Sequence, residues 1–493
     1  MKETKNTLSE KTFSGFLWMF SGSGIQGISQ FLVLIILARL IEPSEFGIVS
    51  AAMVVIGFSI IFSSLGVGPA LVQRPILNDN HINSAFILSL LTGSFFTLSI
   101  FLMSYPISRF FNIEELDQVL KILSFTFLIQ GIYTTALSLL ERDLQYKTIS
   151  IINASAYVFG YGFTGITLGL NGYGVYSLVA AQIVQELFKL ILILRVRNHS
   201  KKIKMNINAL KELMYFGSGF TIARIFNYFA LQGDNLIVGR MLGADSLGIY
   251  GRVYQLMALP ASLFGQVVDK VLFSAMSKLQ TDEKRLKEAY KKAVVLVSMV
   301  ALPISVFAYL FSKEIIFVLL GKGWGEAVLP FNILTIGIFF RTSYKISESV
   351  ARSTGAVYRR AWRQAIYALS VLIGCFIGQN WGLIGIAVAV NVALVINYIL
   401  MAQLSLSILS VKLLEFIKIN IPAVLNGIVL FIVLSIVNIH LSNPLLTLII
   451  NFLILILVLL IVCTLFPRYF LGKEAEWIIK FVKKYFYSIR QKK

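Results

Sequence analysis

The sequence predicts an all-α, polytopic membrane protein with about fourteen transmembrane helices. Three observations support this prediction. First, 57% of the 493 residues are hydrophobic and only 14% are charged, with a mean hydropathy of +0.80, whereas soluble domains carry about 25% charged residues. Second, apolar windows long enough to cross a bilayer, roughly 20 residues each, recur along the chain. Third, residues 38–50 (ARLIEPSEFGIVS) reappear in outline at 239–251 (GRMLGADSLGIYG), and such a repeat is typical of secondary transporters built from two similar bundles.

The windows divide into two sets of six on either side of a basic linker at 196–212. After an N-terminus at 1–11, the first set forms a predicted lobe over 12–195. Its windows lie near residues 12–38, 46–72, 83–105, 118–140, 150–169 and 173–194. The second set forms a predicted lobe over 213–405. Its windows lie near residues 213–238, 247–277, 290–311, 326–350, 364–379 and 383–404.

Two further windows, near 420–438 and 445–466, lie outside the repeat. We expect them to form two additional helices within 406–466. The segment 467–493 follows as a basic, amphipathic tail, in which an apolar stripe faces lysines across a predicted helix. Such a helix is typical of one lying on the inner surface of a membrane.

The basic residues predict the orientation of the chain. Most of the 44 Lys and Arg residues fall in alternate loops, and basic loops face the cytoplasm. We therefore expect both termini to be cytoplasmic. The net charge of +20 then reflects this topology and contact with anionic lipid, and nucleic-acid binding is not predicted.

Sequence motifs for catalysis do not fit their context. Gly22, Gly24 and Gly27 spell G-x-G-x-x-G, but they lie in an apolar helix with no preceding strand, so close helix packing explains them better. The sequence contains no Walker A motif. Cys375 and Cys463 lie in apolar segments and predict neither a disulfide nor a metal site. We expect no enzymatic activity and no cofactor.

Charged residues inside a predicted span give the clearest indication of a binding site. Arg341, Lys345, Glu348 and Arg352 are spaced by four, three and four residues, which places them on one face of a helix. Charges in a membrane are costly and usually face a bundle interior or a water-filled cavity. This net-positive stripe suits an anionic headgroup such as a lipid diphosphate. The alternative is that the cations reach the interface and Glu348 pairs with Lys345 or Arg352.

Other polar residues within spans are further candidates for the cavity. Amide and cationic groups suited to contact sugar or phosphate are Arg224, Asn227, Gln26, Gln30, Gln182 and Gln185. Carboxylates that could bind a coupling H⁺ or Na⁺ are Asp234, Glu348 and Glu186. Salt bridges or hydrogen bonds between helices would explain the same residues, and both interpretations stay open.

The segment 13–74 resembles the start of the polysaccharide transporters of the multidrug/oligosaccharidyl-lipid/polysaccharide (MOP) flippase superfamily. The shape R-L-[IL]-x-P-x-[ED]-[FY]-G is present as Arg39, Leu40, Ile41, Pro43, Glu45, Phe46 and Gly47, followed by Gly66, Gly68, Ala70, Leu71 and Arg74. The resemblance is greatest to the branch of colanic-acid and teichuronic-acid exporters, near the Wzx-type O-antigen flippases. It implies two pseudo-symmetric six-helix lobes around a central cavity, plus two C-terminal helices. Family motif residues such as Arg39, Pro43 and Gly47 are expected to shape an outer turn rather than bind ligand.

The resemblance also implies a function. We expect a flippase that moves an undecaprenyl-diphosphate-linked oligosaccharide from the inner to the outer leaflet of the bacterial cytoplasmic membrane by alternating access. Its partners would be that lipid-linked substrate and membrane lipid, with the polysaccharide polymerase and chain-length machinery as candidates. A cation-coupled multidrug antiporter of the same superfamily is the first alternative. A membrane oligosaccharide polymerase or ligase is the second, although such enzymes usually have a large outer loop.

Overall fold

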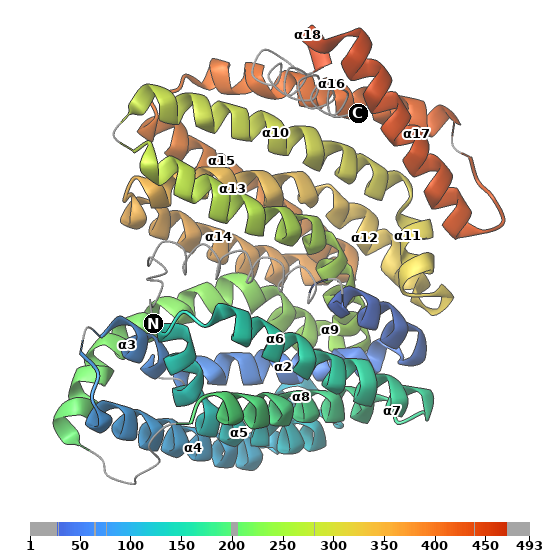
Figure 1. Ribbon diagram of the computed structural model, residues 1–493. Coiled ribbons are helices and arrows are strands. Elements are labelled where there is room, and N and C mark those ends of the chain that lie inside the picture. Colours follow the sequence, from blue (N-terminus) through green and yellow to red (C-terminus); the bar gives the residue numbers. More distant parts are fainter. Residues whose placement is uncertain are drawn as a thin grey trace, which may run out of the picture. The chain divides into compact units, whose positions relative to one another are not determined.

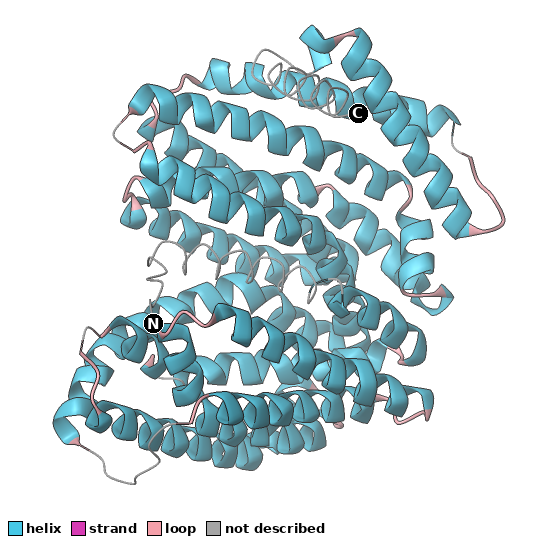
Figure 2. Cartoon of the chain, in the orientation of Figure 1, coloured by secondary structure: helices cyan, strands magenta, loops and turns pink. Residues whose placement is uncertain are grey.

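The computed structural model describes residues 27–470, except for residues 28, 64–65, 75, 199–205, 281 and 438. The described chain consists of helices joined by short loops, and no strand occurs in it (Figures 1 and 2). The predicted N-terminus at 1–11 lies outside the described residues. So does the predicted tail beyond α18 (Pro467–Phe470).

The chain divides into two compact units, Met1–Gly251 and Arg252–Lys493. The first contains a helix over Ser29–Leu40, then α2 (Pro43–Ser63), α3 (Val67–Gln73), α4 (Asp79–Phe111), α5 (Leu116–Arg142), α6 (Tyr146–Tyr157), η1 (Val158–Gly165), α7 (Ile166–Leu170), α8 (Val175–Val196) and the first part of α9 (Ile207–Lys278). The second contains the rest of α9, then α10 (Glu283–Leu310), α11 (Ser312–Leu319), η2 (Lys322–Ala327), α12 (Val328–Thr335), α13 (Gly337–Ser353), α14 (Val357–Gly378), η3 (Gln379–Trp381), α15 (Gly382–Ile408), α16 (Leu413–Val437), α17 (Pro444–Leu465) and α18.

The prediction of an all-α polytopic membrane protein is confirmed. In the described part of the chain, nine helical segments are long and apolar enough to cross a membrane. The number rises to ten if Lys322–Thr335 and Gly337–Ser353, which meet at a 42° bend, are counted as one span. The exact number of fourteen and the predicted lobe boundaries stay predictions.

Helices of the first unit pack closely where glycines face each other. A Cβ atom at Gly93 of α4 would lie 2.6 Å from the carbonyl oxygen of Phe127, and one at Gly131 of α5 would lie 2.5 Å from that of Ser89. Two backbones can approach this closely only where no side chain separates them. The start of α4 is fixed by a capping box, in which Asn78 and His81 each accept a hydrogen bond from the other's backbone N–H.

The long helix α9 breaks at Gly243. This glycine has φ +82° and ψ −174°, a conformation that only glycine adopts readily. Ala244 then begins the next helical stretch, just as Pro43 begins α2 in the first copy of the repeat. The break therefore lies at the place that the repeat predicts.

The second unit is built around α10, α13, α15 and α16. Its buried core includes Tyr290, Val294, Ile346, Val350 and Phe416. The hydroxyl of Tyr290 lies within hydrogen-bond distance of Ser347 and Ser405, so a polar contact ties α10, α13 and α15 together inside an apolar core. This packing fixes the rotation of α13 and thereby the position of its charged face.

Candidate substrate-binding residues

The predicted cationic stripe lies on α13, and its first two cations contact α9. Arg341 Nη1 donates a hydrogen bond of 2.6 Å to the hydroxyl of Tyr254, whose ring centroid is 4.8 Å from the guanidinium carbon. Lys345 Nζ donates to the carbonyl oxygen of Ala261 at 3.2 Å. Both partners belong to the part of α9 in the second unit. These contacts hold the two cations at defined positions on α13, the second helix of the bent pair.

Glu348 forms an ion pair with Arg360 of α14. This partner lies on another helix, whereas the sequence suggested Lys345 or Arg352 on the same helix. Arg352 lies in the last turn of α13 and is half-buried. The Glu348 carboxylate is therefore compensated by a cation of α14.

A second polar cluster lies in the first unit, on α8. Glu186 is buried and accepts hydrogen bonds from the hydroxyl of Tyr133 at 2.7 Å and from Lys189 Nζ at 2.8 Å. Gln182 accepts a hydrogen bond of 3.0 Å from the hydroxyl of Tyr161. The side-chain oxygen of Gln185 is buried and has no hydrogen-bond partner in the described chain. These contacts link the polar side chains of α8 to α5 and η1, and the Glu186 carboxylate is paired with Lys189.

Asp234, on α9 before the break, is also buried. Its carboxylate accepts a hydrogen bond of 2.6 Å from the hydroxyl of Tyr250 and one of 2.8 Å from the backbone N–H of Asn235. Tyr250 comes after the break at Gly243, so this contact joins the two arms of α9. It gives Asp234 a structural role that does not depend on a bound ion.

The remaining candidates give less information. Gln30 is half-buried in the helix over Ser29–Leu40. Gln26 and the side chains of Arg224 and Asn227 lie outside the described residues. Whether any of the candidate residues contacts substrate stays a prediction.

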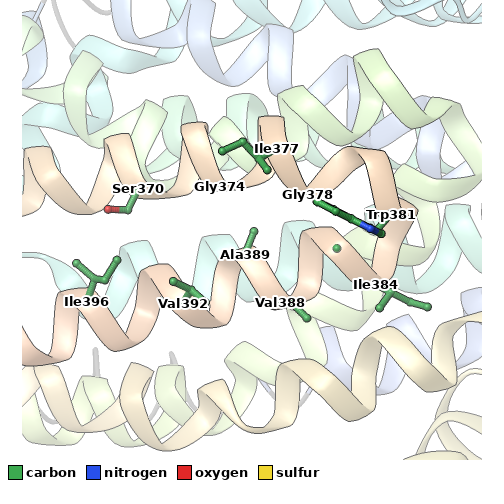
Figure 3. Close-up of a pocket in the computed structure, with 11 residues that line it drawn as sticks. Ser370, Gly374, Ile377, Gly378, Trp381, Ile384, Val388, Ala389, Val392 and Ile396 are labelled. Carbon is green, nitrogen blue, oxygen red and sulfur yellow. The ribbon is translucent and has the colours of Figure 1, made fainter.

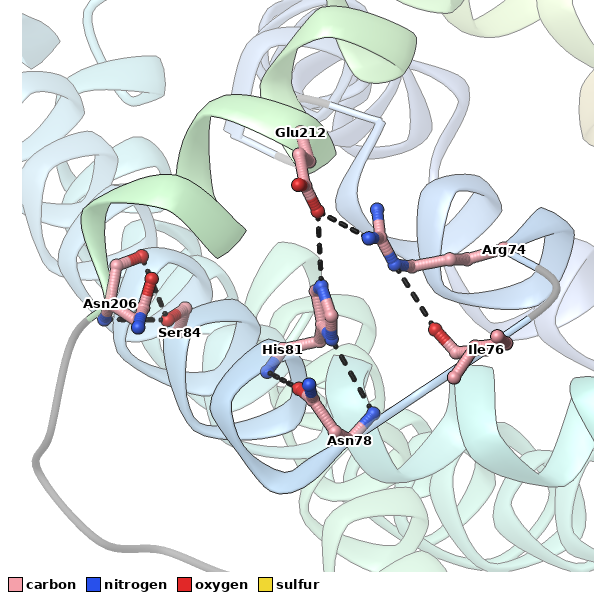
Figure 4. Close-up of polar contacts among 7 residues, drawn as sticks. All are labelled: Arg74, Ile76, Asn78, His81, Ser84, Asn206 and Glu212. Carbon is pink, nitrogen blue, oxygen red and sulfur yellow. Dashed lines mark hydrogen bonds and ion pairs between the residues drawn. The ribbon is translucent and has the colours of Figure 1, made fainter.

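A polar clasp in the first unit was not predicted. Glu212, near the start of α9, pairs with Arg74, and its Oε2 lies 3.2 Å from His81 Nε2 (Figure 4). Because His81 Nδ1 accepts a hydrogen bond from the backbone of Asn78, Nε2 carries the proton and donates to Glu212. Beside it, the Asn206 N–H donates to Ser84 Oγ at 2.9 Å. These residues come from the end of α3, the start of α4 and the start of α9, and neither hydropathy nor helical spacing indicated the contact.

No described His, Cys, Asp or Glu residues form a group of three or more able to hold a metal ion. Neither Cys375 nor Cys463 forms a disulfide. Taken unit by unit, the polar candidate groups on the described helices are cations, amides, hydroxyls and paired carboxylates. This chemistry suits recognition of an anionic, hydroxyl-rich ligand.

Comparison with known proteins agrees with this chemistry. The polysaccharide biosynthesis protein family matches residues 36–329. Teichuronic acid biosynthesis protein TuaB of Bacillus subtilis (strain 168) is 24% identical over 401 residues, which are 80% of this chain and 82% of TuaB. Succinoglycan biosynthesis transport protein ExoT of Rhizobium meliloti (strain 1021) is 24% identical over 341 residues, 69% of each chain.

A solved structure of the lipid II flippase MurJ, in an inward closed conformation, has a similar fold. The TM-score is 0.73 at 18% identity, over 91% of this chain and 98% of MurJ. Together with the family match and the named relatives, this confirms the predicted resemblance to polysaccharide transporters and the predicted polytopic helical fold. Since the family match covers more than half of the sequence, the chain belongs to the polysaccharide biosynthesis protein family.

Proposed function

We propose that the protein is a flippase that moves an undecaprenyl-diphosphate-linked oligosaccharide repeat unit from the inner to the outer leaflet by alternating access. The observation that supports this most strongly is the stripe on α13. Arg341 and Lys345 are held at defined positions by α9, while Glu348 is compensated by Arg360. Cations within a membrane-spanning helix are costly and commonly mark a substrate pathway. A guanidinium group can donate two parallel hydrogen bonds to a phosphate.

The relatives support the same function. ExoT is named as a transport protein of succinoglycan biosynthesis and TuaB as a protein of teichuronic acid biosynthesis. MurJ, which shares the fold, is named as a flippase for lipid II. Transport of a lipid-linked glycan would be consistent with all three names. Such transport requires no catalytic group in the chain.

The predicted topology sets the order in which the substrate would meet the cations of α13. With both termini in the cytoplasm of a bacterial cell, α13 runs from the outer to the inner side of the cytoplasmic membrane. Arg352 then lies nearest the inner leaflet, and Arg341 lies near mid-membrane. The diphosphate would meet these cations in turn. Polysaccharide polymerase and chain-length machinery would receive the substrate on the outer side.

Coupling to an ion would use a buried carboxylate. Asp234, Glu186 and Glu348 are our candidates for binding H⁺ or Na⁺. Glu186 and Glu348 are each paired with a cation, so ion binding there would require the pair to separate. Transport assayed in vesicles with an imposed pH or Na⁺ gradient would test each carboxylate when it is replaced by its amide.

The function itself is tested in cells depleted of the protein. Mass spectrometry of lipid-linked oligosaccharides, with labelling that distinguishes the leaflets, should reveal a completed diphosphate-linked repeat unit accumulating on the inner leaflet. Surface polymer should fall in parallel. An unchanged lipid pool accompanied by new sensitivity to cationic drugs would contradict the proposal and favour a multidrug antiporter.

The site is tested by complementation. Arg341→Ala combined with Lys345→Ala should abolish export while the protein remains at wild-type abundance. Lys418→Ala is the matched control, because Lys418 is an exposed cation on α16, also a membrane-spanning helix. Full export by the double variant would show that the substrate is bound elsewhere.

A further inference from the structure

A narrow apolar groove runs along the hairpin formed by α14 and α15. Its volume is about 410 Å³, and it lies between the two helices with Trp381 at the hairpin tip (Figure 3). Ser370 is the one polar residue among those that line it. The others are Gly374, Ile377, Gly378, Trp381, Ile384, Gly385, Val388, Ala389, Val392 and Ile396.

Small residues at the helix contact create the groove. A Cβ atom at Gly385 would lie 2.0 Å from the carbonyl oxygen of Gly378, and one at Gly374 would lie 3.3 Å from Ala389 Cβ. The backbones therefore nearly touch. Larger side chains on either side of this line stand above it, including Ile377, which is 52% exposed, and Val392, which is 53% exposed. A furrow with a floor of small residues and apolar walls results.

The groove lies at the depth of the membrane. The hairpin belongs to the apolar segment Tyr358–Ile408, so exposed side chains along it face hydrocarbon rather than water. Along α15 the lining runs from Ile384 to Ile396, which is about 18 Å at 1.5 Å per residue. One leaflet of the hydrocarbon core is about 15 Å thick. The groove thus has the length of one leaflet.

The volume of the groove matches that of a single hydrocarbon chain. An apolar cavity of about 150 Å³ accepts one benzene molecule, so the 410 Å³ of this groove provides room for roughly 16 carbon atoms by the same ratio. The dimensions match one unbranched hydrocarbon chain.

We propose that this groove binds one acyl chain of a bilayer phospholipid. Trp381, 67% exposed at the tip, marks the level of the headgroups, where tryptophan side chains concentrate. The chain would extend from there toward Ser370 and Ile396. None of the lining residues is charged, so the groove selects the acyl chain rather than the headgroup. This inference goes beyond the proposed transport function and does not depend on it.

The experiment is native mass spectrometry of the full-length protein purified in mild detergent from native membranes, with the retained lipids identified. Ala389→Leu fills the floor of the groove, and Ser370→Phe fills its inner end. Each should reduce the occupancy of the most tightly retained phospholipid at least fivefold relative to the unmodified protein. Ile399→Phe is the control, because Ile399 is 58% exposed on α15 but does not line the groove, and it should leave that occupancy unchanged.

Two outcomes would overturn the proposal. One is equal phospholipid retention in the unmodified protein and in a filling variant that elutes as a single species on size exclusion. The other is that the molecule displaced by the filling variants is a polyprenyl phosphate. If Ala389→Leu does not fold, Ser370→Phe decides the result, because Ser370 lies at the end of the groove, away from the closest backbone contacts.

Discussion

Gly47 and Gly248 hold equivalent positions in the two copies of the repeat, and a Cβ atom on Gly248 would lie 2.9 Å from the backbone nitrogen of Gly47. Each glycine also faces the first helical residue after the break in the other copy, Ala244 or Pro43. A Cβ on Gly47 would lie 1.8 Å from the carbonyl oxygen of Ala244, and one on Gly248 would lie 1.7 Å from that of Pro43. The glycine of each copy therefore contacts the first helical residue of the other copy, so the same pair of positions meets twice with the copies exchanged. The two copies therefore meet through a local two-fold contact, as in a symmetric dimer interface.

Replacing either glycine by alanine should destabilise the protein. The added Cβ would overlap a backbone carbonyl, which cannot move aside as a side-chain end can, and overpacking typically costs about 1–3 kcal/mol. We expect Gly47→Ala and Gly248→Ala each to lower the apparent unfolding temperature, measured by size exclusion after heating. Gly323→Ala is the control, since nothing lies within 4 Å of its added Cβ. Equal unfolding temperatures for all three variants would show that the close contact is absent.

The helical fold could be predicted because hydrophobic length determines which segments cross a membrane. The window near 173–194, for example, is α8 (Val175–Val196). Bends are harder to predict. The window near 326–350 is divided between α12 and α13, which meet at 42°, and hydropathy does not detect this bend because both helices are apolar enough to belong to one span.

The charged face of α13 could also be predicted, since helical spacing alone places its residues together. Their partners could not. Tyr254 is 87 residues from Arg341, and nothing distinguishes it from other tyrosines in apolar windows. Arg360 forms an ion pair with Glu348 because α14 packs beside α13. Spacing within one helix cannot reveal such a tertiary contact.

Tyr254 should affect transport because its hydroxyl positions Arg341. Tyr254→Phe removes the hydroxyl that accepts from the guanidinium but keeps the ring beneath it. A hydrogen bond to a charged group contributes about 1.5–3 kcal/mol, so we expect export to fall about tenfold at unchanged protein abundance. The measurement is surface polymer produced by a complemented deletion strain.

The matched control is Tyr358→Phe, which removes a hydroxyl from a side chain that is 91% exposed. It should export normally. If Tyr254→Phe exports as well as Tyr358→Phe, the orientation of Arg341 does not limit transport.

Glu186 can be tested for structural and coupling roles together. Glu186→Gln leaves Lys189, whose side chain is 18% exposed, without its anionic partner. Breaking a buried ion pair costs about 3–5 kcal/mol, whereas replacing both members is often neutral. We therefore expect Glu186→Gln to lower the unfolding temperature and the double variant Glu186→Gln, Lys189→Met to recover it.

The double variant then separates the two roles in a transport assay. If it is stable but inactive, its lost activity cannot be attributed to unfolding, and the Glu186–Lys189 pair is required for the transport cycle itself. If it is both stable and active, the carboxylate is structural and the coupling ion binds elsewhere.

The clasp at the start of α9 should make stability depend on pH. The hydrogen bond from His81, together with the charge of Arg74, lowers the pKa of Glu212 below its usual range. A carboxyl whose pKa is lowered by folding stabilises the protein above its unfolded pKa of about 4.3, and this contribution is lost as the pH falls through the folded value. Glu212→Gln should therefore unfold at a lower temperature than the unmodified protein at pH 7. The unfolding temperatures of the two proteins should converge in acid, where Glu212 is protonated in both the folded and the unfolded state.

The control is Glu326→Gln, which alters an exposed carboxylate that forms no ion pair in the described chain. Its unfolding temperature should show no such pH-dependent difference from that of the unmodified protein. A gap between Glu212→Gln and the unmodified protein that persists unchanged from pH 7 to pH 3 would mean that the charge of Glu212 does not hold the clasp together.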